Sequence, residues 1–208
     1  MKIEKRLYNN DTELRAYNEG DQKVIEGYAA LYEVESRLLY ENGKKFIEII
    51  SRGAFKDVIQ NDVYFTYNHS KDTILARTIS GSLVLTEDEK GLRFRAVLNN
   101  TTISNDIYEM VLRGDINENS FAFQVNDGQK WERNAEGVPL RRISRISNLF
   151  DVSVVTKAAY PQTEVYARGF EEFDEYIVEQ EPIEIDKELQ KKMLNVIKLK
   201  EKINKPKK

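Results

Sequence analysis

The sequence has 208 residues, of which 40% are hydrophobic and 32% charged, with a net charge of -3. This length and hydrophobic content suit one domain with an appendage, or at most two small domains, and the near-neutral charge argues against a broad nucleic-acid-binding face. There is no cysteine and only one histidine, which excludes a cysteine nucleophile and a zinc site built from several histidines of one chain.

The first half of the chain is predicted to be mainly β, because short apolar runs alternate with polar residues. The polar residues 1–22 are expected to be irregular, and strands are expected over 23–33 and 46–50. Apolar residues three and four positions apart predict a short helix over 51–60. The next strand is predicted over 62–67 and ends just before the histidine.

A hairpin and a second helix follow. Strict alternation over 82–86 and 92–98, joined by a polar turn with glycine, predicts two adjacent antiparallel strands. The helix is expected to begin at Thr102 or Ser104 and to end at Gly114, since glycine readily adopts the left-handed conformation of a helix stop.

The remaining strands are expected at 120–125, around Trp131, at 141–147 and at 149–156. The chain therefore belongs to the mainly β class with a few α-helices (α+β). Its expected architecture is an antiparallel barrel or a sandwich with short helices at the ends.

Composition divides the chain into a body, 1–168, and two charged segments. Residues 169–186 carry eight acids and no base, which predicts an acidic linker, and residues 187–208 carry nine lysines. The basic segment has apolar residues on one seam and is predicted to form an amphipathic helical tail. This tail is either a solvated helix, or a docking helix for a partner or a coiled coil.

The residues that carry candidate chemistry are Ser120, His69 and Asp151. A serine becomes a nucleophile when a base takes its proton, and an acid behind the imidazole fixes its tautomer. Ser120 and Asp151 both lie opposite the apolar face of their strands, so the three side chains are able to converge. The alternatives are a structural serine with an incidental histidine, and a hydrolase that binds Mg²⁺ or Ca²⁺ through carboxylates alone.

The chain resembles the tailed-phage prohead (capsid maturation) serine proteases. The resemblance spans about residues 24–168 and rests on seven blocks in collinear order: Ile-Glu-Gly-Tyr-Ala-Ala (25–30), Ser-Arg-Gly-Ala-Phe (51–55), Asn-His-Ser with Ile-Leu-Ala-Arg-Thr (68–78), Gly-Leu-Arg-Phe (91–94), Asn-Ser-Phe-Ala-Phe (119–123), Asp-Val-Ser-Val-Val-Thr (151–156) and Ala-Tyr-Pro (159–161). That family is similar in fold to the herpesvirus capsid proteases (assemblins), which implies a β-barrel flanked by helices.

The resemblance also implies residue roles. Ser120 matches the nucleophile and His69 the general base. Assemblins use a second histidine, which this chain lacks, whereas the phage family has an acid at the position of Asp151. Arg77, together with backbone amides, is a candidate for the oxyanion or substrate contact.

The implied activity is that of a serine endopeptidase acting inside the immature capsid (prohead), in the host cytoplasm. Its substrate would be scaffold or the scaffold-like arm of the major capsid protein, and by likeness to the assemblins it would form a homodimer. We expect no cofactor, no metal, no nucleic-acid partner and no membrane partner. The alternative is a catalytically inactive capsid-assembly or scaffold-binding module on the same fold.

Overall fold

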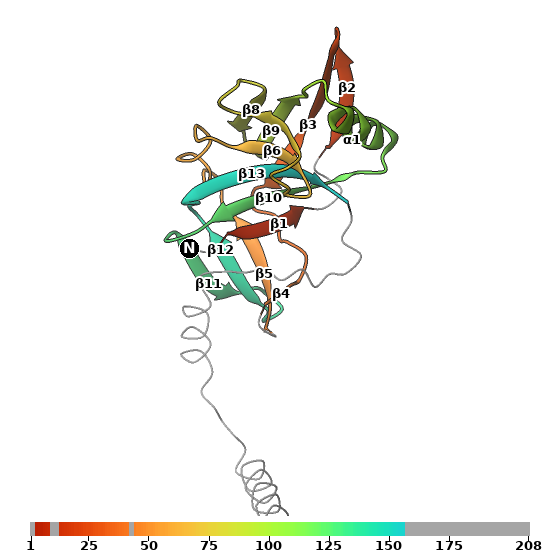
Figure 1. Ribbon diagram of the computed structural model, residues 1–208. Coiled ribbons are helices and arrows are strands. Elements are labelled where there is room, and N and C mark those ends of the chain that lie inside the picture. Colours follow the sequence, from red (N-terminus) through yellow and green to blue (C-terminus); the bar gives the residue numbers. More distant parts are fainter. Residues whose placement is uncertain (1–2, 9–12, 42–43, 157–208) are drawn as a thin grey trace, which may run out of the picture. The chain divides into compact units, whose positions relative to one another are not determined.

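The computed structural model describes residues 3–8, 13–41 and 44–156 (Figure 1). The acidic linker and the basic helical tail predicted from composition lie outside these residues. Three sheets make up the described part, together with one α-helix. The coarse expectation of a mainly β protein is therefore confirmed.

The first sheet carries the candidate nucleophile, and its strands follow the spatial order β1-β10-β13-β6-β7. The bounds are Glu4–Tyr8 (β1), Glu118–Gln124 (β10), Asn148–Val155 (β13), Tyr64–Tyr67 (β6) and Ile74–Arg77 (β7). β13 and β6 are parallel and their neighbours antiparallel, so the carboxyl ends of β13 and β6 meet at one edge of the sheet.

Two further sheets pack around this one. One has the order β2-β3-β9-β8, with bounds Arg15–Glu19, Gln22–Leu31, Gly91–Val97 and Leu83–Glu87, and contains the predicted hairpin β8–β9. The other has the order β11-β12-β5-β4, with bounds Gln129–Arg133, Pro139–Ile143, Lys44–Ile50 and Leu39–Glu41. Its β12–β5 pair is parallel, like β13–β6, whereas the other strand pairs of the described residues are antiparallel.

The sheets do not close into the expected barrel. At the outer edge of β7, single hydrogen bonds replace the ladder that closure would require. The amide of Asn99 donates to the carbonyl of Leu75 (3.2 Å), and the amide of Arg77 donates to the hydroxyl of Ser82 (2.9 Å). These contacts satisfy edge groups of β7 without a continuous strand pairing, and the first two sheets remain separate.

The helix α1, Thr102–Arg113, ends as predicted at Gly114, whose φ of 83° is left-handed. Its N-cap is Thr101, one residue before the expected start, and the Thr101 hydroxyl accepts from the amide of Ser104 (3.3 Å). α1 contacts β2 and β3 (Figure 1). Within the described residues, no helix has the length and hydrophobicity needed to cross a membrane.

The helix expected over 51–60 is absent, and that segment forms a series of turns instead. Gly53 adopts a left-handed φ of 76°, which breaks a right-handed helix in its first turn. Phe55 and Val58 are nevertheless buried in the core, as their spacing indicated. The segment therefore supplies apolar side chains to the core without being helical.

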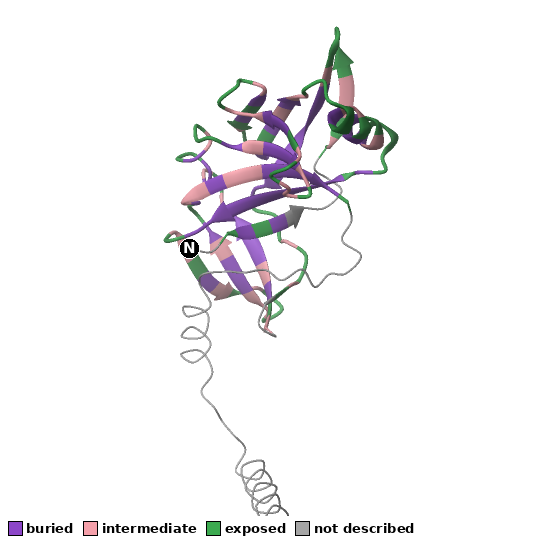
Figure 2. Cartoon of the chain, in the orientation of Figure 1, coloured by how far each residue is buried: buried purple, intermediate pink, exposed green. Residues whose placement is uncertain are grey.

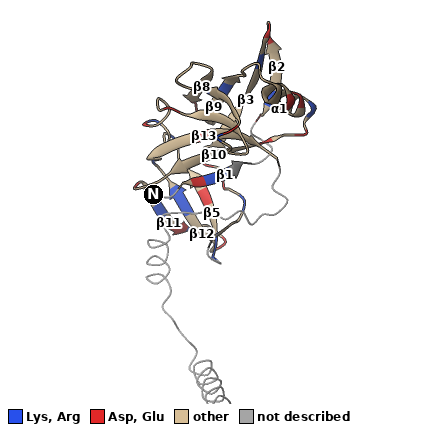
Figure 3. Ribbon diagram, in the orientation of Figure 1, with Lys and Arg blue, Asp and Glu red and all other residues tan. Residues whose placement is uncertain are grey.

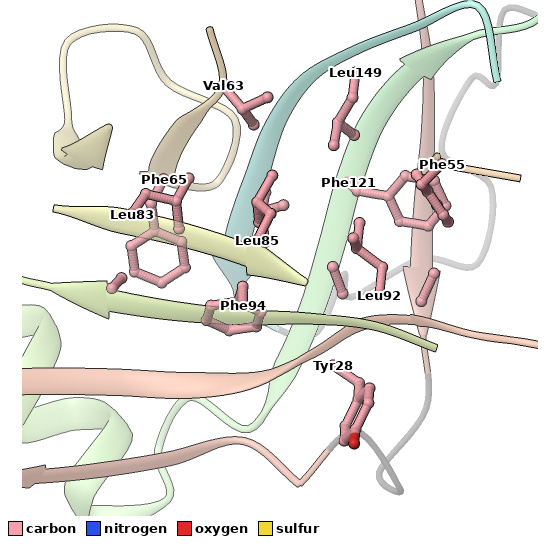
Figure 4. Close-up of a cluster of buried hydrophobic side chains, with 14 of the residues drawn as sticks. Tyr28, Phe55, Val63, Phe65, Leu83, Leu85, Leu92, Phe94, Phe121 and Leu149 are labelled. Carbon is pink, nitrogen blue, oxygen red and sulfur yellow. The ribbon is translucent and has the colours of Figure 1, made fainter. Parts of the chain in front are cut away.

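The hydrophobic core lies between the sheets and is built around β10 (Figures 2 and 4). Phe121 is fully buried, and its ring lies 5.5 Å from that of Phe55 and 4.8 Å from that of Phe123. Burying one such side chain contributes about 1.5–3 kcal/mol. The core thus fixes one face of β10 and leaves the other face, with Ser120, for the site.

The strand β1, Glu4–Tyr8, lies within the segment 1–22 that was expected to be irregular, and it carries half of a buried ionic cluster. Arg6 donates to Glu48 at 2.6 and 2.8 Å and to Glu4 at 2.7 Å, and Arg141 donates to Glu48 at 3.0 Å and to Glu4 at 3.0 Å. All four side chains are at most 1% exposed. Figure 3 shows the charged stripes of β12 and β5 side by side. The cluster ties β1 to the sheet of β5 and β12.

Candidate active site

Ser120 is the third residue of β10. The strand begins two residues earlier than predicted. β10 is paired on both sides, and Ser120 is opposite Ser153 on β13. The side chain is 3% exposed. Ser120 is therefore held on an internal strand whose opposite face is anchored in the core by Phe121 and Phe123.

His69 follows β6 in a tight turn with an unusual backbone. Asn68 and His69 both have left-handed φ angles, 52° and 59°. The amide of Asn68 donates to the carbonyl of Val154 (3.0 Å), and the Asn68 side-chain oxygen accepts from the amide of Thr156 (3.1 Å). The turn is thus fastened to the end of β13, and it directs the imidazole toward that strand.

The three predicted side chains form a continuous chain of hydrogen bonds. The distance between His69 Nε2 and Ser120 Oγ is 2.7 Å, and that between His69 Nδ1 and Asp151 Oδ1 is also 2.7 Å. The side chains of His69 and Asp151 are 9% and 15% exposed. Because an ionised carboxylate only accepts, the hydrogen of the neutral imidazole lies on Nδ1, and Nε2 is free to accept the Ser120 proton.

Two buried hydroxyls behind this chain were not singled out from the sequence. Ser153 Oγ lies 2.8 Å from Asp151 Oδ1 and 2.6 Å from Thr66 Oγ1. Ser153 is fully buried and Thr66 is 2% exposed. The sequence signal was the strand period of two, which places Ser153 on the same face as Asp151.

Arg77 lies on β7, three strands from β10 in the sheet order, or roughly 14 Å at a strand spacing of about 4.8 Å. Its guanidinium makes two hydrogen bonds to Asp62, one of 2.7 Å, and lies 4.6 Å from the centre of the Tyr64 ring. This hydrogen-bonded pairing lowers the pKa of Asp62 below its ordinary value. The structure therefore does not bring Arg77 to Ser120.

In the described part of the chain, no three or more His, Cys, Asp or Glu side chains gather in a way that would hold one metal ion. The carboxylate-metal hydrolase considered from the sequence thus has no candidate ligand set among these residues.

The sequence profile of the caudovirus prohead serine proteases matches residues 10–176. This chain belongs to that family. The resemblance inferred from the sequence motifs is therefore confirmed, and the match includes all three side chains of the hydrogen-bonded chain.

Among solved structures, this prohead protease is similar to the bacteriophage T4 capsid assembly protease gp21, with a TM-score of 0.47 and 11% sequence identity over 76% of this chain and 98% of that one. No curated protein matches it.

Proposed function

We propose that this prohead protease is a serine endopeptidase in which Ser120 is the nucleophile, His69 the general base and Asp151 the acid that orients the base. The observation that carries the proposal is the pair of 2.7 Å contacts that the only histidine of the chain makes to Ser120 and Asp151. Family membership supports a protease activity.

The proposed reaction begins with attack of Ser120 Oγ on the scissile carbonyl carbon while its proton passes to His69 Nε2. The imidazolium is stabilised by Asp151 and then gives that proton to the leaving amine as the C–N bond breaks. Water, activated by the same imidazole, hydrolyses the acyl-enzyme and restores Ser120. An oxyanion hole is required as well, and backbone amides near Ser120 are the candidates.

The proposed substrate is scaffold or the scaffold-like arm of the major capsid protein, cut inside the immature capsid in the host cytoplasm. Arg77 is better placed to contact substrate beyond Asp151 than to stabilise the oxyanion, because Asp62 holds it three strands from Ser120. Homodimerisation, inferred from likeness to the assemblins, stays a prediction, and sedimentation of the purified protein would test it.

The test is co-expression with the cognate major capsid protein, whose mass is then measured. We expect truncated capsid protein with the wild type and with Ser144→Ala, a matched change at an exposed serine, and intact capsid protein with Ser120→Ala. The purified wild type should also react with a serine-directed phosphonate, and Ser120→Ala and His69→Ala should not.

Capsid protein that stays intact with the wild type, together with no phosphonate adduct, would overturn the proposed endopeptidase activity. If capsids still assembled only when this protein is present, the inactive assembly or scaffold-binding function would be favoured instead. Cleavage that persisted in Ser120→Ala would instead overturn the assignment of the nucleophile.

A further inference from the structure

The Ser153 hydroxyl lies within hydrogen-bond distance of both the proposed base, His69, and its acid, Asp151. Its oxygen lies 2.8 Å from Asp151 Oδ1, 3.3 Å from the backbone nitrogen of His69, 3.3 Å from His69 Nδ1 and 2.6 Å from Thr66 Oγ1. Ser153 is fully buried, so bulk water does not compete for these contacts. A hydroxyl has one hydrogen and two lone pairs, which makes the four contacts a countable network.

With Asp151 ionised, one assignment of the hydrogens satisfies the shortest contacts of this network. An ionised Asp151 only accepts, so the Ser153 hydrogen points to Asp151 Oδ1. The backbone amide of His69 only donates, so it occupies one lone pair of Ser153. The Thr66 hydroxyl, whose distance to Ser153 Oγ is the shortest of the four, donates to the other lone pair.

Because its one hydrogen is donated to Asp151 Oδ1, Ser153 cannot also donate to His69 Nδ1, so it gives no support to the tautomer that leaves Nδ1 without a hydrogen. A hydrogen on Nδ1 has its acceptor in Asp151 Oδ1, at 2.7 Å. Its alternative, a hydrogen on Nε2, would leave that carboxylate contact unmade and would aim a donor at Ser120. The network therefore favours the tautomer in which Nε2 is able to take the Ser120 proton.

The same hydroxyl also stabilises the backbone of the base. His69 has a left-handed φ of 59°, a conformation that is strained for a residue other than glycine. Its amide finds a buried acceptor in Ser153 Oγ. One side chain thus fixes the position of the imidazole through the backbone and the direction of its hydrogen through Asp151.

We propose that Ser153, oriented by Thr66, is a positioning residue that holds His69 in the Nδ1–H tautomer and in its left-handed turn. This inference rests on the proposed function, since the tautomer matters for catalysis only if His69 is the base. Ser153 itself touches no reacting atom and acts through Asp151 and His69.

The test compares Ser153→Ala, Thr66→Val and the matched control Thr66→Ser, which keeps the hydroxyl. The full-length proteins are labelled with a serine-directed phosphonate, and the rate of adduct formation is measured. A hydrogen bond to a charged group contributes an amount equivalent to roughly 10–100-fold in rate. We expect a fall of this size in Ser153→Ala, a smaller fall in Thr66→Val, and a rate within about twofold of the wild type in Thr66→Ser.

The second readout is the imidazole ¹H–¹⁵N correlation spectrum, which is unambiguous because the chain has one histidine. The wild type and Thr66→Ser should show the hydrogen on Nδ1, and Ser153→Ala should show a mixture with Nε2–H. Thr66→Val removes the hydroxyl but keeps nearly the same side-chain volume. It therefore tests the hydrogen-bond network even if Ser153→Ala fails to fold.

An unchanged tautomer in Ser153→Ala and Thr66→Val, with labelling rates within about twofold of the wild type, would overturn the inference. A wild type that forms no adduct would overturn the proposed function instead. The spectrum would still report whether Ser153 sets the tautomer, so the two failures are distinguishable.

Discussion

Replacing Glu48 with glutamine removes one negative charge from the buried cluster while keeping its shape. Glu48 accepts two hydrogen bonds from Arg6 and one from Arg141, and each of these side chains is at most 1% exposed. The amide of glutamine offers one acceptor oxygen and brings two donors that face guanidinium groups. The substitution therefore leaves positive charge buried without full compensation.

Removing one partner of a buried ion pair costs about 3–5 kcal/mol. In a protein of this size, each kcal/mol lowers the melting temperature by about 2–4 °C, so we expect a fall of roughly 6–20 °C. Urea unfolding followed by circular dichroism gives the free energy directly. The matched control is Glu19→Gln, which breaks the exposed pair with Arg95 and should cost less than about 1 kcal/mol.

The contribution of ionised Glu48 to stability depends on pH in a direction set by its pKa shift. Burial opposes ionisation of Glu48, but the charges of Arg6 and Arg141 outweigh burial and lower its pKa. The stabilisation is therefore complete above the unfolded value of about 4.3 and is lost as pH falls through the lower folded value. The difference in unfolding free energy between the wild type and Glu48→Gln should therefore narrow as the pH falls below about 4.3. The reasoning would be refuted if Glu48→Gln cost no more than Glu19→Gln at neutral pH.

Two further predictions concern the second sheet. An alanine at Gly91 would place its Cβ 2.0 Å from the carbonyl oxygen of Ala30, so Gly91→Ala should lower the unfolding free energy by about 1–3 kcal/mol or more. In the control Gly20→Ala, the added Cβ meets no atom within 4 Å, and the cost is only the strain of the left-handed φ. Equal losses of unfolding free energy in the two variants would contradict the steric argument. The hydrogen bond from Tyr28 to Asp88, aided by burial, raises the pKa of Tyr28 to about 12. The advantage of wild type over Tyr28→Phe in unfolding free energy should thus persist to about pH 10 and vanish as pH rises to about 12, and an advantage independent of pH would argue against this bond.

The sequence predicted which faces of the strands carry polar side chains, because the strand period of two is a local property. Ser120 and Asp151 lie opposite buried neighbours, as that period indicated. The period does not say which strands become neighbours. The parallel pairing of β6 with β13 joins residues more than 80 positions apart, and it brings the turn that carries His69 close to Asp151.

The missed elements share a different physical cause. The charged residues Glu4 and Arg6 make the sequence of β1 look like a solvent-exposed segment. Their burial is stabilised by ion pairs with Glu48 on β5 and Arg141 on β12, which the local sequence does not show. The segment 51–60 has the apolar spacing of a helix, but the left-handed conformation of Gly53 depends on how the chain enters the core. In both segments, tertiary contacts override the local pattern.

The family profile begins at residue 10, whereas β1 ends at Tyr8. A protein trimmed to the profile would lose the strand that covers the outer edge of β10 and half of the charges that neutralise Glu48 and Arg141. The bare edge would present unpaired amides and carbonyls beside Ser120, which is the kind of surface that recruits strands from other chains. The segment that the family profile matches is thus shorter than the one expected to remain soluble and monodisperse.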